Sequence, residues 1–363
     1  MTLDPKPGVL DVQPYVPGRS DAAGVVRIFK MSSNESPFGP SPKAIAAYES
    51  AETALGLYPE GTSRILREAI AKHFGLEAEN VICGNGSDEL LHLIADTYLR
   101  PGDEVMFSTH AFSLYKIATL RNSATPVEVP EPQLKMDVDG VLARINPRTR
   151  IIFLANPNNP TGTYLPVAEL RRLHTGLPNS ALLVIDAAYA EYVGRDDYEP
   201  GIELVRASEN VIMTRTFSKA YGLAGVRCGW AYFPPAIAAV LNRVRQPFNV
   251  NVAGQHAAVA ALGDQAFVGK VVRHNETWRA WLISEIRKLS NKGIRVDDSV
   301  GNFVLLHFAD AKRANEADRF LMSRGIILRS CASYALPQCL RLTVGSEEAN
   351  QAAVAALKEL PGS

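Results

Sequence analysis

The sequence predicts an α/β protein in which a large domain, with a mostly parallel sheet flanked by helices, is joined to a smaller α+β domain. A chain of 363 residues is too long for one compact core and fits two domains. Short apolar runs alternate with helical patterns as far as about Phe248, where the character of the chain changes. We therefore expect an N-terminal arm at 1–30, a large domain at 31–249 and a small domain at 250–363.

The first elements follow an arm that prolines keep irregular. The prolines stand at Pro5, Pro7, Pro14 and Pro17. The stretch 64–74 carries its apolar residues on one helical face, and Gly75 is expected to end that helix. A short strand is expected at 80–83 and a helix at 88–99, before Pro101.

Further apolar runs are expected to complete the large sheet. They are short, apolar throughout and bounded by turn residues, which is typical of strands buried on both faces, as parallel sheets require. Helical patterns such as 167–173 supply the crossovers between them. The expected strands are 104–108, 151–155, 182–185 and 211–214.

The small domain begins with one long helical pattern over 266–289, whose aromatic and aliphatic residues recur every three or four positions. We interpret this stripe as core and not as a ligand site. Strand-like pieces then surround a helix at 314–323. These strands are expected at 303–308, 326–329 and 340–344.

Composition excludes several classes of function. Lys plus Arg and Asp plus Glu both number 38, so the chain lacks the basic surface typical of nucleic-acid binding or membrane anchoring. Its four cysteines are widely spaced without a Cys-x-x-Cys pair, so we expect free thiols and no metal site. The first 18 residues lack the apolar core of a secretory signal, and no apolar run suits a bilayer. We expect a cytoplasmic protein.

A lysine that follows two small hydroxyl residues is the most informative feature of the chain. Lys219 follows Thr216 and Ser218, and Arg227 stands eight residues later. Such an amine can form a Schiff base with an aldehyde cofactor, while the hydroxyls and the guanidinium hold that cofactor's phosphate. Pyridoxal phosphate needs this combination. An isolated Ser-Lys pair would more often be part of a surface loop, so the interpretation depends on three upstream motifs.

Two of these motifs are turns that follow expected strands. The segment 84–88 (Gly-Asn-Gly-Ser-Asp) lies between a strand and a helix, where free N–H groups and the helix dipole favour a phosphate. The same residue types also serve simply as helix caps. The segment 156–162 (Asn-Pro-Asn-Asn-Pro-Thr-Gly) is stiffened by prolines and would fix Asn159 as a hydrogen-bond donor to a phenolate oxygen, unless it is a plain loop.

The third motif places a carboxylate at the end of a buried strand. Asp186 directly follows the apolar run 182–185, and an unpaired charge at that position is costly. A protonated pyridine nitrogen would pair with it and would be kept protonated by it. Tyr189 could then share the phenolate oxygen with Asn159. Capping of the following segment by Asp186 is the structural alternative.

Taken together, these motifs resemble those of the fold-type I pyridoxal-phosphate-dependent aminotransferases, in order and in spacing. Within that family the chain is most similar to the histidinol-phosphate aminotransferases. The likeness spans nearly the whole chain. It includes 14–18 (Pro-Tyr-Val-Pro-Gly), 34–41 (Asn-Glu-Ser-Pro-Phe-Gly-Pro-Ser), 58–61 (Tyr-Pro-Glu-Gly) and 340–345 (Leu-Arg-Leu-Thr-Val-Gly).

The resemblance implies a role for each motif residue. Lys219 carries the cofactor and later acts as the base, so that the catalytic residues are Lys219, Asp186 and Tyr189. The ring is held by Asp186, Asn159, Tyr189 and a stacked Phe112. The phosphate is held by the side chains of Thr216, Ser218 and Arg227, together with backbone groups at Gly86, Ser87 and Asp88.

The resemblance also implies partners. Tyr58 would reach the cofactor of a second subunit, so the active unit would be a homodimer. Arg341 would bind the anionic group of the substrate, with Arg329 and Asn34 in the same pocket; a structural salt bridge is the alternative for Arg341. The chain departs from the family at Ala187, where Glu is frequent, and at Ser36, where Asn is common. These departures bear on substrate preference and not on cofactor binding.

The implied reaction is transamination between L-histidinol phosphate, as amino donor, and 2-oxoglutarate. An aromatic amino-acid aminotransferase or a threonine-phosphate decarboxylase of the same fold is the nearest alternative, because the cofactor motifs would be the same. A non-catalytic ligand sensor is disfavoured by the retained Lys219. A dinucleotide-dependent dehydrogenase is disfavoured because Glu89 stands where the third glycine of Gly-x-Gly-x-x-Gly belongs.

Overall fold

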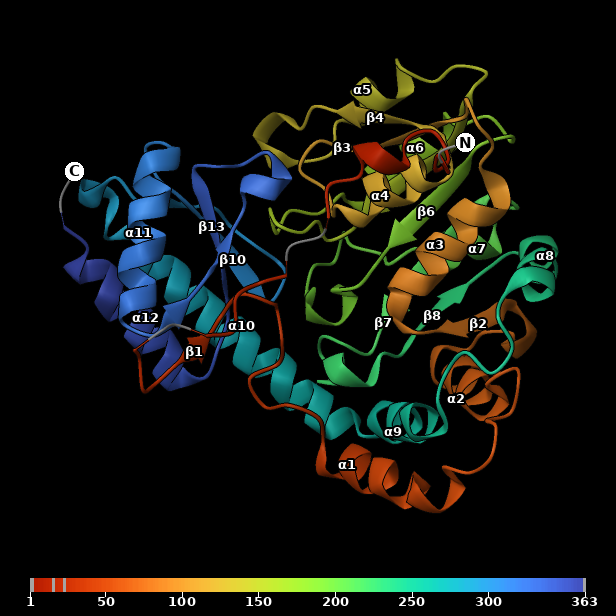
Figure 1. Cartoon of the computed structure of the whole chain (residues 1–363), viewed down its shortest axis with the longest axis horizontal. Coiled ribbons are helices and arrows are strands. Elements are labelled where there is room, and N and C mark those ends of the chain that lie inside the picture. The colour runs from red at the N-terminus through yellow and green to blue at the C-terminus, as the bar shows by residue number, and fades with distance from the viewer. Residues whose placement is uncertain (1–2, 15–16, 22–23, 362–363) are drawn as a thin grey trace.

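The computed structural model describes residues 3–14, 17–21 and 24–361, so Tyr15 and Val16 of the 14–18 motif lie outside the described residues. These residues form two bodies (Figure 1). The larger is built on a seven-stranded sheet in the order β2-β8-β7-β6-β5-β3-β4, in which only β8 runs antiparallel to its neighbours. The strands are β2 (Val81–Gly84), β3 (Glu104–Ser108), β4 (Thr125–Val129), β5 (Thr149–Ala155), β6 (Leu182–Asp186), β7 (Val211–Thr216) and β8 (Gly229–Tyr232).

Helices cover both faces of this sheet, which explains why its central strands are apolar at successive positions. Along β5, Ile151 and Phe153 enter one core while Ile152 and Leu154 enter the other. The first core is closed by α3 (Gly86–Tyr98), α4 (Leu114–Arg121) and α8 (Pro235–Val244). The second is closed by α2 (Arg64–Phe74), α5 (Val138–Leu142), α6 (Val167–Thr175), α7 (Ile202–Arg206) and α9 (Val252–Gly263).

The smaller body combines an antiparallel sheet with helices, as expected. Its four strands lie in the order β12-β13-β10-β9, and a separate parallel pair joins β1 to β11. The helices α10, α11 and α12 close its core. The bounds are β1 (Phe29–Lys30), β9 (Arg295–Val296), β10 (Phe303–His307), β11 (Ile326–Ile327), β12 (Arg329–Ser330), β13 (Cys339–Thr343), α10 (Gln265–Arg287), α11 (Ala311–Ser323) and α12 (Glu347–Glu359).

One segment near each end of the larger body's sequence crosses between the two bodies or lies at their junction. β1 leaves the N-terminal arm to pair with β11, and Met31 enters the core of the smaller body. In the other direction, α9 packs on α1 (Pro42–Glu49) and α2 at the base of the larger body (Figure 1). Its faces are largely alanine and lie against those helices, so a boundary at residue 249 would detach α9 from its core. We propose that the small domain starts within α10, which passes from one body to the other.

The sheet topology brings the sequence motifs to one edge. β5, β6 and β7 are parallel, and β2 runs the same way because both β2 and β7 are antiparallel to β8. The loops after their carboxyl ends therefore emerge on the same side, which is where ligands bind in open α/β sheets. Among the described residues, no helix is both long and apolar enough to cross a membrane.

Candidate active site

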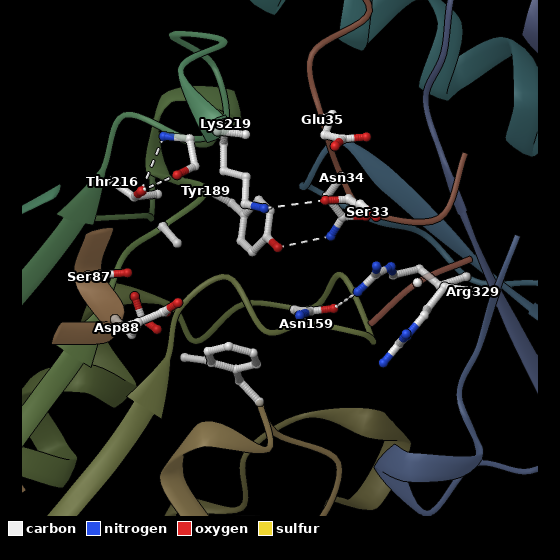
Figure 2. Close-up of a pocket in the computed structure, with 18 of the residues that line it drawn as sticks. Ser33, Asn34, Glu35, Ser87, Asp88, Asn159, Tyr189, Thr216, Lys219 and Arg329 are labelled. Atoms are coloured by element: carbon white, nitrogen blue, oxygen red, sulfur yellow. Dashed lines mark hydrogen bonds between the residues drawn. The ribbon is translucent and has the colours of Figure 1, made fainter. Parts of the chain in front are cut away.

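A cavity of about 280 Å³ lies at this edge of the sheet and is lined by both bodies. Figure 2 shows Ser87, Asp88 and Thr216 on one side of it and Arg329 on the opposite side, with Lys219, Tyr189 and Asn159 between them. Most residues singled out from the sequence line this cavity. They are Asn34, Ser87, Asp88, Phe112, Asn159, Asp186, Tyr189, Thr216, Ser218, Lys219, Arg227, Arg329 and Arg341.

Lys219 extends into the centre of the cavity. Its Nζ lies 3.5 Å from the Ser33 carbonyl oxygen and 5.7 Å from the centre of the Tyr189 ring. Desolvation, followed by the positive charge of Arg341, lowers the pKa of the Lys219 amine to about 8. A considerable fraction of the amine is therefore neutral near physiological pH, as a nucleophile or base must be.

Asp186 lies at the carboxyl end of β6, where two hydroxyl groups hold its carboxylate. Tyr115 donates to Oδ2 over 2.9 Å and Thr214 donates to Oδ1 over 3.0 Å. Burial raises the pKa of Asp186 to about 6, while these two hydrogen bonds act in the opposite direction. The carboxylate is thus ionised at neutral pH and aimed into the cavity, where a cationic partner would be stabilised.

Tyr115 was missed by the sequence analysis although its side chain controls Asp186. Its ring is fully buried and stacks on Phe153, with the ring centres 4.8 Å apart and the planes 7° from parallel. The sequence signal was available, because a tyrosine on the buried face of a helix needs a polar partner for its hydroxyl group. Its position three residues after Phe112 placed it beside the same loop.

Tyr189 and Asn34 form a second hydrogen-bonded group. The Asn34 amide donates from Nδ2 to the Tyr189 hydroxyl over 2.9 Å, and its Oδ1 accepts from Thr343 over 3.0 Å. Burial raises the pKa of the Tyr189 hydroxyl, so this group remains protonated and can act as a donor. Asn34 therefore orients Tyr189 from the smaller body.

The turn after β2 and the segment after β7 form a cradle at the N-terminus of α3. A Cβ on Gly86 would lie 2.6 Å from Arg227 Nη2, and one on Gly229 would lie 2.5 Å from the Ser87 amide nitrogen. Thr216 donates to Ser218 over 3.0 Å, and Arg227 lies 3.4 Å from the same hydroxyl group. Backbone N–H groups, two hydroxyls and a guanidinium thus converge where a phosphate would be stabilised. Gly86 itself borders this cradle and does not line the cavity.

Two arginines project from neighbouring strands of the smaller body. Arg341 and Arg329 are register partners on β13 and β12, so both point to the same face of the sheet. Arg341 is buried and donates to Asn159 Oδ1 and, over 2.7 Å, to the Ser32 carbonyl. Both acceptors are uncharged, so the positive charge of Arg341 is available to an anion in the cavity.

Tyr58 lies away from the cavity of its own chain. Its side chain is 82% exposed and stacks on Phe248 with ring centres 4.9 Å apart. Several further cavity residues were given no role from the sequence, among them Ser33, Glu35 and Tyr334. Ser33 and Glu35 flank Asn34, and Tyr334 comes from the smaller body. No cluster of potential metal ligands occurs among the described residues.

Known proteins resemble this chain in sequence and in fold. The family model for aminotransferase class I and II matches residues 26–357. The chain belongs to this family. It is 53% identical over 358 residues to a histidinol-phosphate aminotransferase of Rhodopseudomonas palustris, covering 98% of this chain and 97% of that protein.

Solved structures resemble this chain in fold. The crystal structure of histidinol-phosphate aminotransferase from Sinorhizobium meliloti in complex with pyridoxal-5'-phosphate matches with a TM-score of 0.86 and 31% identity, over 94% of this chain and 91% of that chain. The L-threonine-O-3-phosphate decarboxylase of Porphyromonas gingivalis matches with a TM-score of 0.79 and 21% identity, over 91% of this chain and 98% of that chain, which shows a shared fold alone. The predicted α/β class and the predicted family are confirmed.

Proposed function

We propose that the protein is a pyridoxal-phosphate-dependent aminotransferase that transfers the amino group of L-histidinol phosphate to 2-oxoglutarate. The products are imidazole acetol phosphate and glutamate, and the reaction belongs to histidine biosynthesis. The observation that carries this conclusion is the 53% identity to a histidinol-phosphate aminotransferase along nearly the whole of both chains. A cytoplasmic location stays a prediction from the sequence.

The cavity suits pyridoxal phosphate in its chemistry. We assign the phosphate to the backbone N–H groups of Gly86, Ser87 and Asp88 and to the side chains of Thr216, Ser218 and Arg227, because a Cβ at position 86 would fill the space beside Arg227. Asp186 would pair with the pyridine nitrogen, Asn159 and Tyr189 with the phenolate oxygen, and Phe112 with the ring face. When bound, the cofactor withdraws the electrons released at the substrate's α-carbon.

Lys219 has two roles in the proposed reaction. Its Nζ, whose neutral form is favoured by the lowered pKa, would be the nucleophile that binds the cofactor's aldehyde group. When a substrate amine has taken its place, the same nitrogen would be free to act as the base that accepts the proton of the substrate's α-carbon and later gives a proton back. The ionised Asp186 would pair with the ring nitrogen and favour its protonated form.

Substrate recognition is assigned to residues that reach the cavity from the smaller body. Arg341 would bind the phosphate of the amino donor or a carboxylate of 2-oxoglutarate, because its guanidinium can pair with either group bidentately. Arg329 lies beside Arg341 in register and would share that anion. Asn34 would line the same space while it orients Tyr189.

A second copy of the chain would complete the site. Tyr58 stacks on Phe248, and both side chains are exposed, which is typical of residues at an interface. Further exposed apolar residues near Tyr58 in the sequence are Ile45, Tyr48, Leu55 and Leu57. The arrangement supports a homodimer in which Tyr58 reaches the phosphate site of the partner, as the family resemblance implies.

The substrate assignment is tested by half-reactions on the purified holoenzyme. L-Histidinol phosphate, L-phenylalanine and L-threonine phosphate are added in turn, and the change in the cofactor's absorbance is followed. We expect the apparent second-order rate constant of the half-reaction to be greatest with histidinol phosphate. A greater rate constant with phenylalanine, or release of carbon dioxide from threonine phosphate, would replace this function with one of its two relatives of the same fold.

A further inference from the structure

A buried carboxylate that lies outside the cavity connects two of the loops that line it. Glu131 follows β4, is 9% exposed, and forms no part of the cavity wall. Burial raises the pKa of this carboxyl group, while the backbone N–H of His110 acts in the opposite direction. Burying a carboxyl group costs free energy unless its oxygens form hydrogen bonds. The partners of Glu131 therefore indicate what it does in the fold.

Each oxygen of Glu131 accepts a hydrogen bond from a different loop. Oε2 accepts the backbone N–H of His110 over 2.7 Å, two residues before Phe112. Oε1 accepts from the Asn158 side chain, whose Nδ2 lies 3.2 Å away and which directly precedes Asn159. The loop after β3 and the loop after β5 are thereby joined through one carboxylate.

The two loops carry the side chains assigned to opposite parts of the cofactor ring. Phe112 would stack on its face and Asn159 would donate to its phenolate oxygen. The separation between these side chains must match the ring closely, since a displacement of about 1 Å can lower the rate of an enzyme about a hundredfold. Neither side chain is bonded directly to the other, whereas their loops share Glu131.

His110 extends the connection to the smaller body. Its Nδ1 donates to the Tyr334 carbonyl oxygen over 2.8 Å, and Tyr334 lines the cavity. The same residue is therefore held by its backbone from Glu131 and by its ring from the smaller body. Asn159 is also held from that body, by Arg341.

We propose that Glu131 is a positioning residue for the transamination site, and that it sets the separation between Phe112 and Asn159 through the His110 and Asn158 contacts. The proposal rests on the proposed function, because it assumes that these side chains hold pyridoxal phosphate. Glu131 touches neither cofactor nor substrate. It acts by fixing the geometry of the two loops before the cofactor binds.

The test compares Glu131→Ala with Glu104→Ala. Glu104 is the control, because it is also a buried carboxylate whose two oxygens both accept hydrogen bonds. Its donors are the side chains of Asn146 and Arg148, and it lies at the amino end of β3. Apo protein is prepared from each variant, its melting temperature is recorded, and pyridoxal phosphate is titrated while the absorbance and induced circular dichroism of the bound cofactor are followed.

We expect Glu131→Ala to weaken cofactor binding about tenfold and to alter the induced circular dichroism, since it removes the hydrogen bonds to both loops. Glu104→Ala should lower the melting temperature but leave the dissociation constant within twofold. In Glu131→Gln, the amide can still accept from the His110 N–H, so binding should recover at least in part. A dissociation constant for Glu131→Ala within twofold of wild type, or an equal loss in Glu104→Ala, would overturn the proposal.

A double substitution separates positioning from general damage. If Glu131 acts through Asn159, then Glu131→Ala combined with Asn159→Ala should weaken binding by less than the product of the two single effects. A full product would overturn the proposal. If Glu131→Ala fails to fold, Glu131→Gln enters the same cycle. Failure of the proposed function gives a different result. Absence of pyridoxal phosphate from the site would leave wild type and Glu104→Ala also without lysine-linked cofactor absorbance, whereas a different substrate would change the half-reactions of wild type and leave these binding constants unaffected.

Discussion

The hydrogen bond from Tyr115 to Asp186 should make the stability of the apo protein depend on pH. Replacing Tyr115 with Phe keeps the ring stacked on Phe153 and removes only the hydroxyl group that donates to Asp186 over 2.9 Å. A hydrogen bond to an ionised group contributes about 1.5–3 kcal/mol, and one between neutral groups about 0.5–1.5 kcal/mol. The difference is roughly 1–1.5 kcal/mol, which corresponds to about one pKa unit.

The raised pKa of Asp186 decides whether stability rises or falls with pH. The pKa of Asp186 is about 6 in the folded protein and near 4 in the unfolded chain, so burial already destabilises the fold above about pH 4, increasingly up to pH 6. Losing the Tyr115 hydroxyl should move the folded pKa to about 7. Between pH 6 and pH 7 the stability of the variant then continues to fall, whereas that of wild type no longer changes. Below pH 5 Asp186 is protonated in both proteins, so its charge adds no difference between them.

The assay is urea unfolding of the apo proteins at pH 5 and pH 8.5. We expect Tyr115→Phe to cost about 1 kcal/mol at pH 5 and about 2–2.5 kcal/mol at pH 8.5. Tyr198→Phe is the control, because Tyr198 donates over 2.9 Å to the neutral carbonyl of Asn156 and its loss should cost the same at both pH values. An equal cost for Tyr115→Phe at the two pH values would refute the assignment of Tyr115 as the group that keeps Asp186 ionised.

Three further substitutions test the assigned roles. Lys219→Ala should abolish turnover and the lysine-linked absorbance band, and wild-type turnover in this variant would reject the scheme; borohydride reduction of the holoprotein should likewise leave a pyridoxyl adduct on Lys219 by mass spectrometry. Arg341→Ala should raise the Michaelis constants for histidinol phosphate and 2-oxoglutarate by about 10-fold to 100-fold, because a charge-assisted pair is lost. Unchanged constants for both would remove Arg341 from the substrate site. Gly86→Ala should weaken pyridoxal-phosphate binding at least tenfold, since φ at this position is +76° and the new Cβ would lie 2.6 Å from Arg227; binding equal to wild type would show that the turn can relax.

The sequence was sufficient for five of the seven strands of the large sheet, whereas β4 and β8 were not predicted. The runs predicted at 104–108, 151–155, 182–185 and 211–214 are all strands, with β3 matching at both ends. The helix predicted at 64–74 has those bounds, and Gly75 ends it in the left-handed conformation. Burial on both faces leaves a continuous apolar run, and helical packing leaves a periodic one, so both patterns are visible without any knowledge of partners.

The limits of the two bodies needed the tertiary structure. Pairing of β1 with β11 joins residues 29–30 to 326–327, and the periodicity of so short a segment carries no information about its partner. α9 shows no polar face that would have indicated which body it covers. Its place against α1 and α2 is decided by packing alone.

For the site, the sequence determined which side chains gather at the carboxyl edge of the sheet, because the motifs follow parallel strands and the family pattern orders them. Their surroundings were decided only in three dimensions. Tyr115 reaches Asp186 across 71 positions of the chain, and Arg341 reaches Asn159 across 182. Glu131 joins two loops that are separate in sequence. Local patterns record which face of an element is buried, whereas the partner of each buried polar group depends on how distant elements pack, and that is fixed only when the whole chain has folded.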